Sequence, residues 1–283
     1  KWDSTKPRGV DYEILHNAEP YRDFPIDTAK KKDPSGCIVI YEFPQEINGH
    51  IPNDLYQFMG LDPYVEENID RGGSVAAFYI IMNPKYIPFG YKGNTIVASY
   101  IGKPIEGLDH YYENLEKLIQ FYGNPMQGLC YEKNRGESCR AHFIKKHKVN
   151  LLMPTPNQEQ GSNMYQKNIT SFGYNVGNRL VKIPLTKMVN DWLLEETELA
   201  DGKKKNIERI PCLYLIRQIM QYNIDENFDA VDGFRGAIIN MREYQNKQTS
   251  EAKTKAKKTN DFKGILSNER IFKKYQSGRF SAT

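Results

Sequence analysis

Four short runs of aromatic and β-branched residues lie within the first 101 residues, and a helical pattern follows them. The runs cover residues 37–43, 55–62, 75–82 and 95–101. This composition predicts strands, and the Asn-Pro and Gly-rich segments between the later runs predict turns. We therefore expect consecutive strands of an antiparallel meander. A helix should follow at 108–122, where apolar residues recur every three or four positions.

The middle of the chain alternates between strand and helix patterns, which is typical of a parallel sheet. The expected elements are a strand at 126–132, a helix at 137–147, a strand at 149–153, a helix at 184–199, a charged turn at 202–205, a helix at 212–221 and a last helix at 227–246. Asn227 can cap the last helix. Together with the meander, these elements predict an α/β fold with a mixed sheet flanked by helices.

Length and composition limit the class of protein. A chain of 283 residues fits one large domain or two small ones. With 39% hydrophobic and 26% charged residues it lies in the globular range, which excludes collagen-like and wholly disordered chains. No stretch approaches the roughly 20 consecutive apolar residues that cross a bilayer, so no membrane partner is expected. The four cysteines form no C-x-x-C pair, which argues against a zinc site or a disulfide framework.

Both ends of the chain differ in composition from its centre. Residues 1–34 contain four prolines and predict an extended lead-in, whereas residues 35–246 are expected to form one domain. Residues 247–283 hold ten Lys or Arg against three acidic residues, a net charge of +7, and predict a basic, partly disordered tail. This tail is either an arm that binds phosphates or a solvated linker. Its candidate DNA contacts are Lys253, Lys255, Lys257 and Lys258.

Three acidic residues stand where a mixed sheet exposes side chains at its edge. Asp62 and Glu132 end two apolar strand patterns, and Asp229 begins a helix. Pro63 ends the first strand because it cannot donate a ladder hydrogen bond. If the three carboxylates meet, they repel one another unless cations lie between them. Mg²⁺ suits such an all-oxygen site, and two ions can support hydrolysis of a phosphodiester.

Each acid also has a purely structural interpretation. Asp62 can cap a turn, Glu132 can pair with Lys133 or Arg135, and Asp229 can stabilise a helix N-terminus. Residue spacing leaves both interpretations open.

A family resemblance adds to this pattern. The runs at 58–64, 130–136 and 227–237 resemble three motifs of the C-terminal nuclease domain of the large terminase subunit of tailed double-stranded DNA phages. The segment 172–179 is also similar, and the resemblance extends over about residues 37–245.

This resemblance implies a ribonuclease H-like fold and a metal-dependent endonuclease that cuts concatemeric phage DNA during genome packaging. It further implies that Asp62, Glu132 and Asp229 are catalytic metal ligands for Mg²⁺ or Mn²⁺, with two ions. Members of the family differ in which position of the third motif carries the acid, so Asp232 is a second ligand or an orienting group. Asp229 is favoured.

The resemblance also implies partners and a location. The partners would be double-stranded DNA, the terminase ATPase domain, the portal protein and the small terminase subunit. The site of action would be the cytoplasm of the infected bacterium, at the procapsid portal, and not the mature virion. No G-x-x-x-x-G-K-[ST] motif occurs in the chain, so we expect no ATPase activity and interpret it as the nuclease half of the enzyme.

Other residues and other functions remain open at this point. Candidates for phosphate positioning are Lys133, Asn134, Arg135, Asn178 and Arg179, although solvated loops explain them equally well. One alternative function is another ribonuclease H-like nuclease, such as a junction resolvase or a transposase. Another is a non-catalytic module that docks on DNA or the portal.

Overall fold

In the computed structural model the chain forms two compact units, one that ends at Met241 and one that begins at Arg242. The sheet lies in the first unit, and residues 242–250 of the second are helical. The structure describes residues 37–64, 75–104, 106–156, 171–176 and 179–250. The predicted lead-in at 1–34, and all of the predicted tail beyond residue 250, lie outside these ranges.

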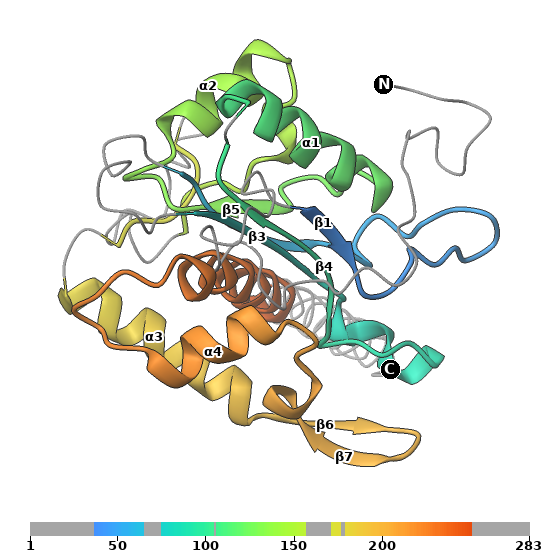
Figure 1. Ribbon diagram of the computed structural model, residues 1–283. Coiled ribbons are helices and arrows are strands. Elements are labelled where there is room, and N and C mark those ends of the chain that lie inside the picture. Colours follow the sequence, from blue (N-terminus) through green and yellow to red (C-terminus); the bar gives the residue numbers. More distant parts are fainter. Residues whose placement is uncertain (1–36, 65–74, 105, 157–170, 177–178, 251–283) are drawn as a thin grey trace, which may run out of the picture. The chain divides into compact units, whose positions relative to one another are not determined.

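A mixed sheet of five strands forms the centre of the first unit (Figure 1). Its strands are β1 (Cys37–Ile40), β2 (Phe58–Asp62), β3 (Ala76–Ile81), β4 (Ile96–Gly102) and β5 (Leu129–Tyr131), in the order β1-β4-β3-β2-β5. β2, β3 and β4 are antiparallel neighbours, and β5 returns through a helix to lie parallel to β2. The predicted class, an α/β fold with a mixed sheet flanked by helices, is therefore confirmed.

The first strand departs from the predicted meander. β1 pairs with β4 at the far edge of the sheet and not with β2, the next strand in sequence. The connection from Ile40 to Phe58 is too long for a hairpin, whose loops usually have two to five residues. The chain therefore crosses from one side of the meander to the other before β2 begins.

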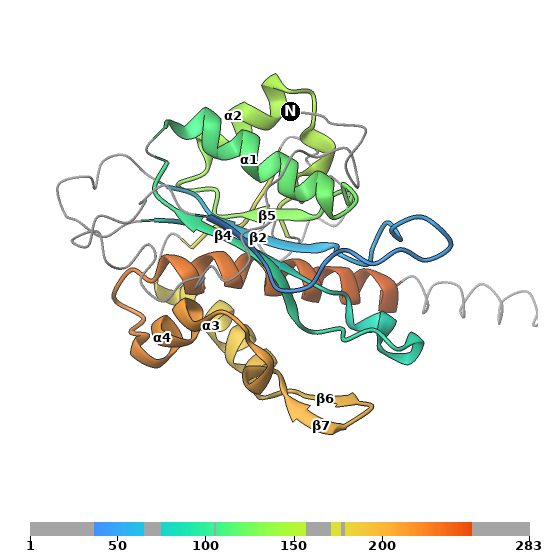
Figure 2. The same ribbon diagram turned by 45° about the vertical axis from the view of Figure 1, so that its right-hand side comes forward.

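Helices cover both faces of the sheet. α1 (Leu108–Phe121) and α2 (Glu137–Lys145) lie on one face, and α3 (Arg179–Leu194), α4 (Leu213–Gln221) and residues 229–241 of the last helix lie on the other (Figures 1 and 2). The main core fills the space under α1 and α2 with fully buried apolar side chains, among them those of Phe78, Leu115, Ile119 and Phe143.

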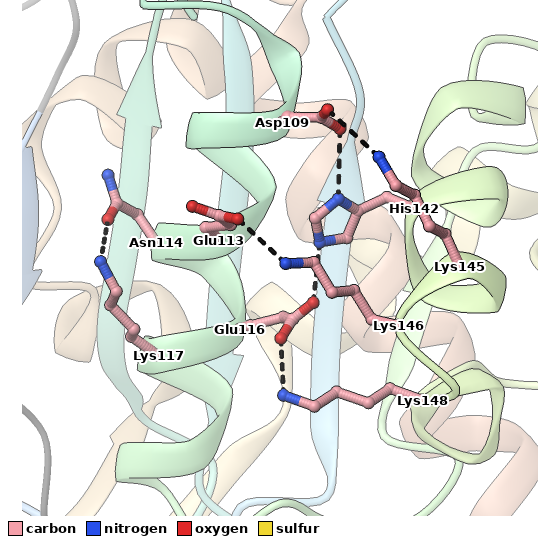
Figure 3. Close-up of polar contacts among 9 residues, drawn as sticks. All are labelled: Asp109, Glu113, Asn114, Glu116, Lys117, His142, Lys145, Lys146 and Lys148. Carbon is pink, nitrogen blue, oxygen red and sulfur yellow. Dashed lines mark hydrogen bonds and ion pairs between the residues drawn. The ribbon is translucent and has the colours of Figure 1, made fainter. Parts of the chain in front are cut away.

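A buried polar network joins α1 to α2 (Figure 3). His142 Nε2 lies 2.7 Å from Glu116 Oε1, and the other oxygen of Glu116 accepts a hydrogen bond from Lys148 Nζ at 2.6 Å. His142 Nδ1 lies 3.4 Å from a carboxylate oxygen of the exposed Asp109. Glu116 and His142 are buried, and these contacts supply the polar partners that buried polar groups require.

The last helix touches the sheet through backbone atoms. A Cβ atom added to Gly60 of β2 would lie 2.1 Å from the backbone nitrogen of Ala237, and one added to Gly233 would lie 2.2 Å from the carbonyl oxygen of Ala77. Side chains do not fit between the two layers at these positions. The glycines therefore let residues 229–241 lie closer to β2 and β3 than a side chain would allow.

Several predicted elements are wrong in detail. The strand expected at 149–153 is a short 3-10 helix, Val149–Leu151, after which Leu152 makes a single parallel bridge to Leu129. Other short 3-10 helices are Pro84–Phe89, which replaces the predicted turn between β3 and β4, and Asn206–Arg209. Such short apolar runs do not by themselves distinguish a strand from a buried turn.

The segment after α3 is also different from the prediction. A hairpin of β6 (Glu196–Leu199) and β7 (Gly202–Lys205) replaces the expected helix end and charged turn. Glu196 stands opposite Lys205 and Glu198 opposite Lys203, and such pairs of opposite charge stabilise a hairpin. Within the described ranges, the helices are all too short or too polar to cross a membrane.

Candidate metal centre

Three buried carboxylates meet at one edge of the sheet. One side-chain oxygen each of Asp62, Glu132 and Asp232 lies within 4.8 Å of the others. Asp62 is 1% exposed, Glu132 6% and Asp232 4%. A group of this kind, with carboxylate oxygens alone, matches the donor preference of a hard divalent cation such as Mg²⁺.

Backbone pairing brings the first two acids together. Asp62 is the last residue of β2, and Glu132 follows β5, which runs parallel to β2. The amide of Glu132 donates a hydrogen bond to the carbonyl of Leu61 at 3.1 Å, which continues the ladder by one residue. Both side chains therefore emerge at the carboxyl ends of neighbouring strands, where open α/β sheets place their ligands.

Asp62 is the least compensated of the acids. Neither of its side-chain oxygens has a hydrogen-bond partner among the described residues, although the side chain is buried. Burial raises the pKa of Asp62 well above its usual value, and the charges of Asp229 and Glu132 raise it further. A buried charge without a partner costs several kcal/mol, on the order of a lost ion pair. A bound cation would provide the missing partner.

Asp232 is held by a buried arginine one turn further along the helix. Arg235 Nη1 forms an ion pair with Asp232 Oδ1, and Arg235 Nη2 donates to the hydroxyl of Tyr222 at 3.1 Å. The hydroxyl of Tyr174 donates to the backbone carbonyl of Asp232 at 2.7 Å. Arg235 is fully buried, so it is a fixed positive charge beside the acids.

Asp229, the favoured third ligand, lies beside the group of three and not within it. Its Oδ2 accepts a hydrogen bond from the amide of Val75 at 2.8 Å, and its Oδ1 accepts one from Asn227 Nδ2. Burial raises the pKa of Asp229, and these hydrogen bonds oppose that rise. The charge of Asp229 raises the pKa of Asp62 more than the charges of Glu132 and Asp232 do, which indicates that Asp229 is also a neighbour of Asp62.

Arg135 is a basic residue that the structure brings near all four of these acids. It lies in the loop between β5 and α2, is half-buried, and donates from Nη1 to Asn227 Oδ1 at 3.0 Å. Burial lowers the pKa of its guanidinium, but the charges of the four acids, those of Asp62 and Glu132 first, together raise it above its usual value. Asn227, predicted as a helix cap, instead links Arg135 to Asp229.

The other predicted contacts are less closely connected to the acids. Lys133 is half-buried and Asn134 is exposed in the loop after Glu132, and Arg179 forms an ion pair with Asp225 at 3.5 Å. Asn178, Lys253, Lys255, Lys257 and Lys258 lie outside the described residues.

Sequence reasoning missed Arg235, Tyr174 and Lys182 as neighbours of the acids. Arg235 had a visible signal, because it follows Asp232 by three residues, a spacing that places both on one helix face. Tyr174 lies in the segment 172–179 that resembles the family, but nothing in that segment singles out its hydroxyl, and Lys182 had no signal because only the tertiary fold brings it near the acids.

Comparison with known proteins gives few matches. No family model matches the chain, and no curated protein does. Among solved structures, it is similar to the large terminase nuclease of the thermophilic phage G20c, in crystal structures with bound zinc (TM-score 0.41) and with bound magnesium (TM-score 0.36). In both comparisons the sequence identity is 11%, and the alignment covers 70% of this chain and 92% of the terminase nuclease chain.

Proposed function

We propose that this chain is a divalent-metal-dependent endonuclease that cuts double-stranded DNA. The observation that supports this proposal most strongly is the carboxylate of Asp62, which is buried, lacks a hydrogen-bond partner among the described residues and lies within 4.8 Å of oxygens of Glu132 and Asp232. These donors are all oxygens, as Mg²⁺ and Mn²⁺ prefer. The residues present therefore fit a hard divalent ion.

The residues around the site have separate tasks in this proposal. Asp62, Glu132 and Asp232 would hold the metal, and Asp229 beside them would supply a further carboxylate for a second ion. Bound metal would activate a water molecule and stabilise the leaving oxygen of an in-line phosphodiester displacement. Arg235 orients Asp232, while the amide of Val75 and the side chain of Asn227 orient Asp229.

The biological role that we propose is cutting of concatemeric phage DNA during genome packaging. Support comes from the resemblance of the segments around Asp62, Glu132 and Asp229 to terminase nuclease motifs. In this role the chain would act with the packaging ATPase domain, the portal protein and the small terminase subunit, at the procapsid portal in the infected cell.

A plasmid-cutting assay tests the proposal. Supercoiled plasmid at low salt is incubated with the protein and Mg²⁺, Mn²⁺ or excess EDTA, and with the Asp62→Asn variant in parallel. Asp191→Asn is the matched control, because Asp191 is an exposed acid of α3 that pairs with Lys187. We expect metal-dependent nicking and linearisation by the wild type and the control, with loss of both in EDTA and in Asp62→Asn.

The assay also separates the competing functions. Full cutting by Asp62→Asn would contradict the proposed site. A strong preference for branched over linear DNA would indicate a junction resolvase. Salt-dependent DNA binding with no metal dependence and no cutting would indicate a docking module.

A further inference from the structure

Three basic side chains converge on three consecutive residues next to the acids. Arg179 of α3 pairs with the carboxylate of Asp225 at 3.5 Å. Lys182 of α3 donates from Nζ to the backbone carbonyl of Glu226 at 3.0 Å. Arg135 donates from Nη1 to the side chain of Asn227, also at 3.0 Å. The residues that they contact are consecutive, with Cα atoms about 3.8 Å apart, so the three cations gather around one short segment; we call these three side chains the basic row.

The basic row borders the carboxylates directly. Asn227, at one end of the contacted segment, donates to Asp229. Arg135 faces Asp62 and Glu132 closely enough for their charges to stabilise its protonated form. The charge of Lys182 also reaches Glu132, from a different element of the fold. Arg135 from the β5–α2 loop and Lys182 from α3 therefore lie near the acids, and Arg179 contacts the residue next to the one that Lys182 contacts.

The contacts that hold the basic row can be exchanged for others. Arg179 and Asp225 are 66% and 58% exposed, and ion pairs between such exposed groups contribute little. Lys182 and Arg135 are only half-buried. The hydrogen bond of Lys182 to Glu226 uses one of its three donors, and that of Arg135 to Asn227 uses one of its five. An anion that approaches this edge can be bound without breaking the buried core.

We propose that Arg135, Arg179 and Lys182 bind backbone phosphates of the DNA duplex beside the bond to be cut. This inference rests on the proposed function, because the phosphates in question belong to the DNA that the carboxylates would cut. Phosphate contacts position a duplex without reading its sequence, which suits a nuclease that tolerates many sequences. The row also offsets the repulsion between the four carboxylates and an approaching phosphate backbone.

Salt dependence of DNA binding tests the basic row. Binding of a labelled duplex is measured with Ca²⁺ in place of Mg²⁺, for the wild type and for Arg135→Gln, Arg179→Gln and Lys182→Gln. The slope of log affinity against log salt should become shallower by about 0.9 for each phosphate that the variant no longer binds. Lys187→Gln is the matched control, because Lys187 is an exposed lysine of the same helix that pairs with Asp191. Its slope should equal that of the wild type.

Further measurements separate this inference from the proposed function. Melting temperature establishes that each variant is folded, and Arg135→Lys, which keeps the charge, should retain most of the slope. Unchanged slopes in all three Gln variants, or no DNA binding by the wild type, would overturn the basic row even if the wild type cuts plasmid. Shallower slopes in the Gln variants would support phosphate binding by the basic row. If the wild type also bound no Mn²⁺ and cut no DNA, the proposed nuclease function would be contradicted while the basic row was supported.

Discussion

Asp62 ends β2 and Glu132 follows the neighbouring parallel strand β5, and the amide of Glu132 donates a hydrogen bond to the carbonyl of Leu61 at 3.1 Å. The separation of these two acids is therefore set by the hydrogen-bond ladder of the sheet. Asp232 reaches the same point from a helix on the face of the sheet, so its position depends on how closely that helix packs. Two acids are fixed by strand pairing and the third by a helix–sheet contact.

Replacement of Asp62 by Asn should stabilise the metal-free protein while it removes metal binding. The carboxylate is buried with no hydrogen-bond partner in the described part of the chain, and an uncharged amide avoids both the burial cost and the repulsion from Asp229. Each unit of the raised pKa corresponds to about 1.4 kcal/mol of unfolding free energy. Thermal melting in EDTA at pH 7.5 should give a higher Tm for the variant, and Mg²⁺ should raise only the wild-type Tm. A lower Tm in EDTA would show that the Asp62 charge is compensated.

The metal-free protein should lose stability as pH rises. The folded-state pKa of Asp62 is raised above the unfolded value of about 3.9. At pH values between the two, Asp62 is protonated in the folded state and ionised in the unfolded state. Its contribution is fully present below about pH 4 and is lost as pH rises through the folded pKa. Urea unfolding in EDTA from pH 4 upward measures this loss. With Mg²⁺ present the decline should disappear, and an equal decline in both series would contradict a metal at this site.

Replacement of Arg235 by Met should be strongly destabilising. Removing one partner of a buried ion pair leaves the other uncompensated, at a cost of about 3 to 5 kcal/mol. The added change Asp232→Asn removes the stranded charge and should recover part of the loss. Urea unfolding of both single variants and of the double variant measures this coupling. Additive losses would show that the two side chains do not stabilise each other.

Replacement of Gly233 by Ala should destabilise the protein and weaken its cutting. In an ordinary helix this change stabilises by about 1 kcal/mol, but here the new Cβ would lie 2.2 Å from the carbonyl oxygen of Ala77. The helix must move away from the sheet, at a cost of about 1 to 3 kcal/mol, and Asp232 moves with it. Denaturant unfolding and Mn²⁺ binding measure the two effects. A more stable variant with unchanged Mn²⁺ affinity would refute the close contact.

Replacement of Glu116 by Gln should lower stability without affecting the chemistry. The change removes the charge that His142 and Lys148 share between α1 and α2, at a cost of about 1 to 3 kcal/mol. Glu116 lies in the α1–α2 layer, away from the helix that carries Asp232. We expect a lower Tm and a wild-type cutting rate below that temperature, measured on plasmid.

The elements that could be predicted from the sequence are those with strong local patterns. β2, β3 and β4 are buried throughout and therefore appear as continuous apolar runs. β5 was predicted as longer than the observed Leu129–Tyr131, because apolar character alone does not show that Met126 is 65% exposed. The place of β1 beside β4 depends on the path of a long connection, for which local sequence contains no signal.

The candidate site was predictable in its strands and less so in its helix. Asp62 and Glu132 follow from the points at which apolar runs end. The choice between Asp229 and Asp232 depends on the rotation of their helix about its own axis, which is set by contacts of Gly233 with β3. Sequence spacing places both acids on one helix face but does not reveal which of them lies over the sheet edge.

The glycines at the helix–sheet contact lie one or two residues from the acids in sequence, as in Gly60-Leu61-Asp62 and Asp232-Gly233. Backbone touches backbone there, so the spacing of the carboxylates does not depend on the sizes of core side chains. Substitutions of apolar residues elsewhere in the fold should then leave the distances between the carboxylates unchanged. Distant relatives of this chain should accordingly be easier to detect by a short pattern of glycine beside acid than by overall sequence identity.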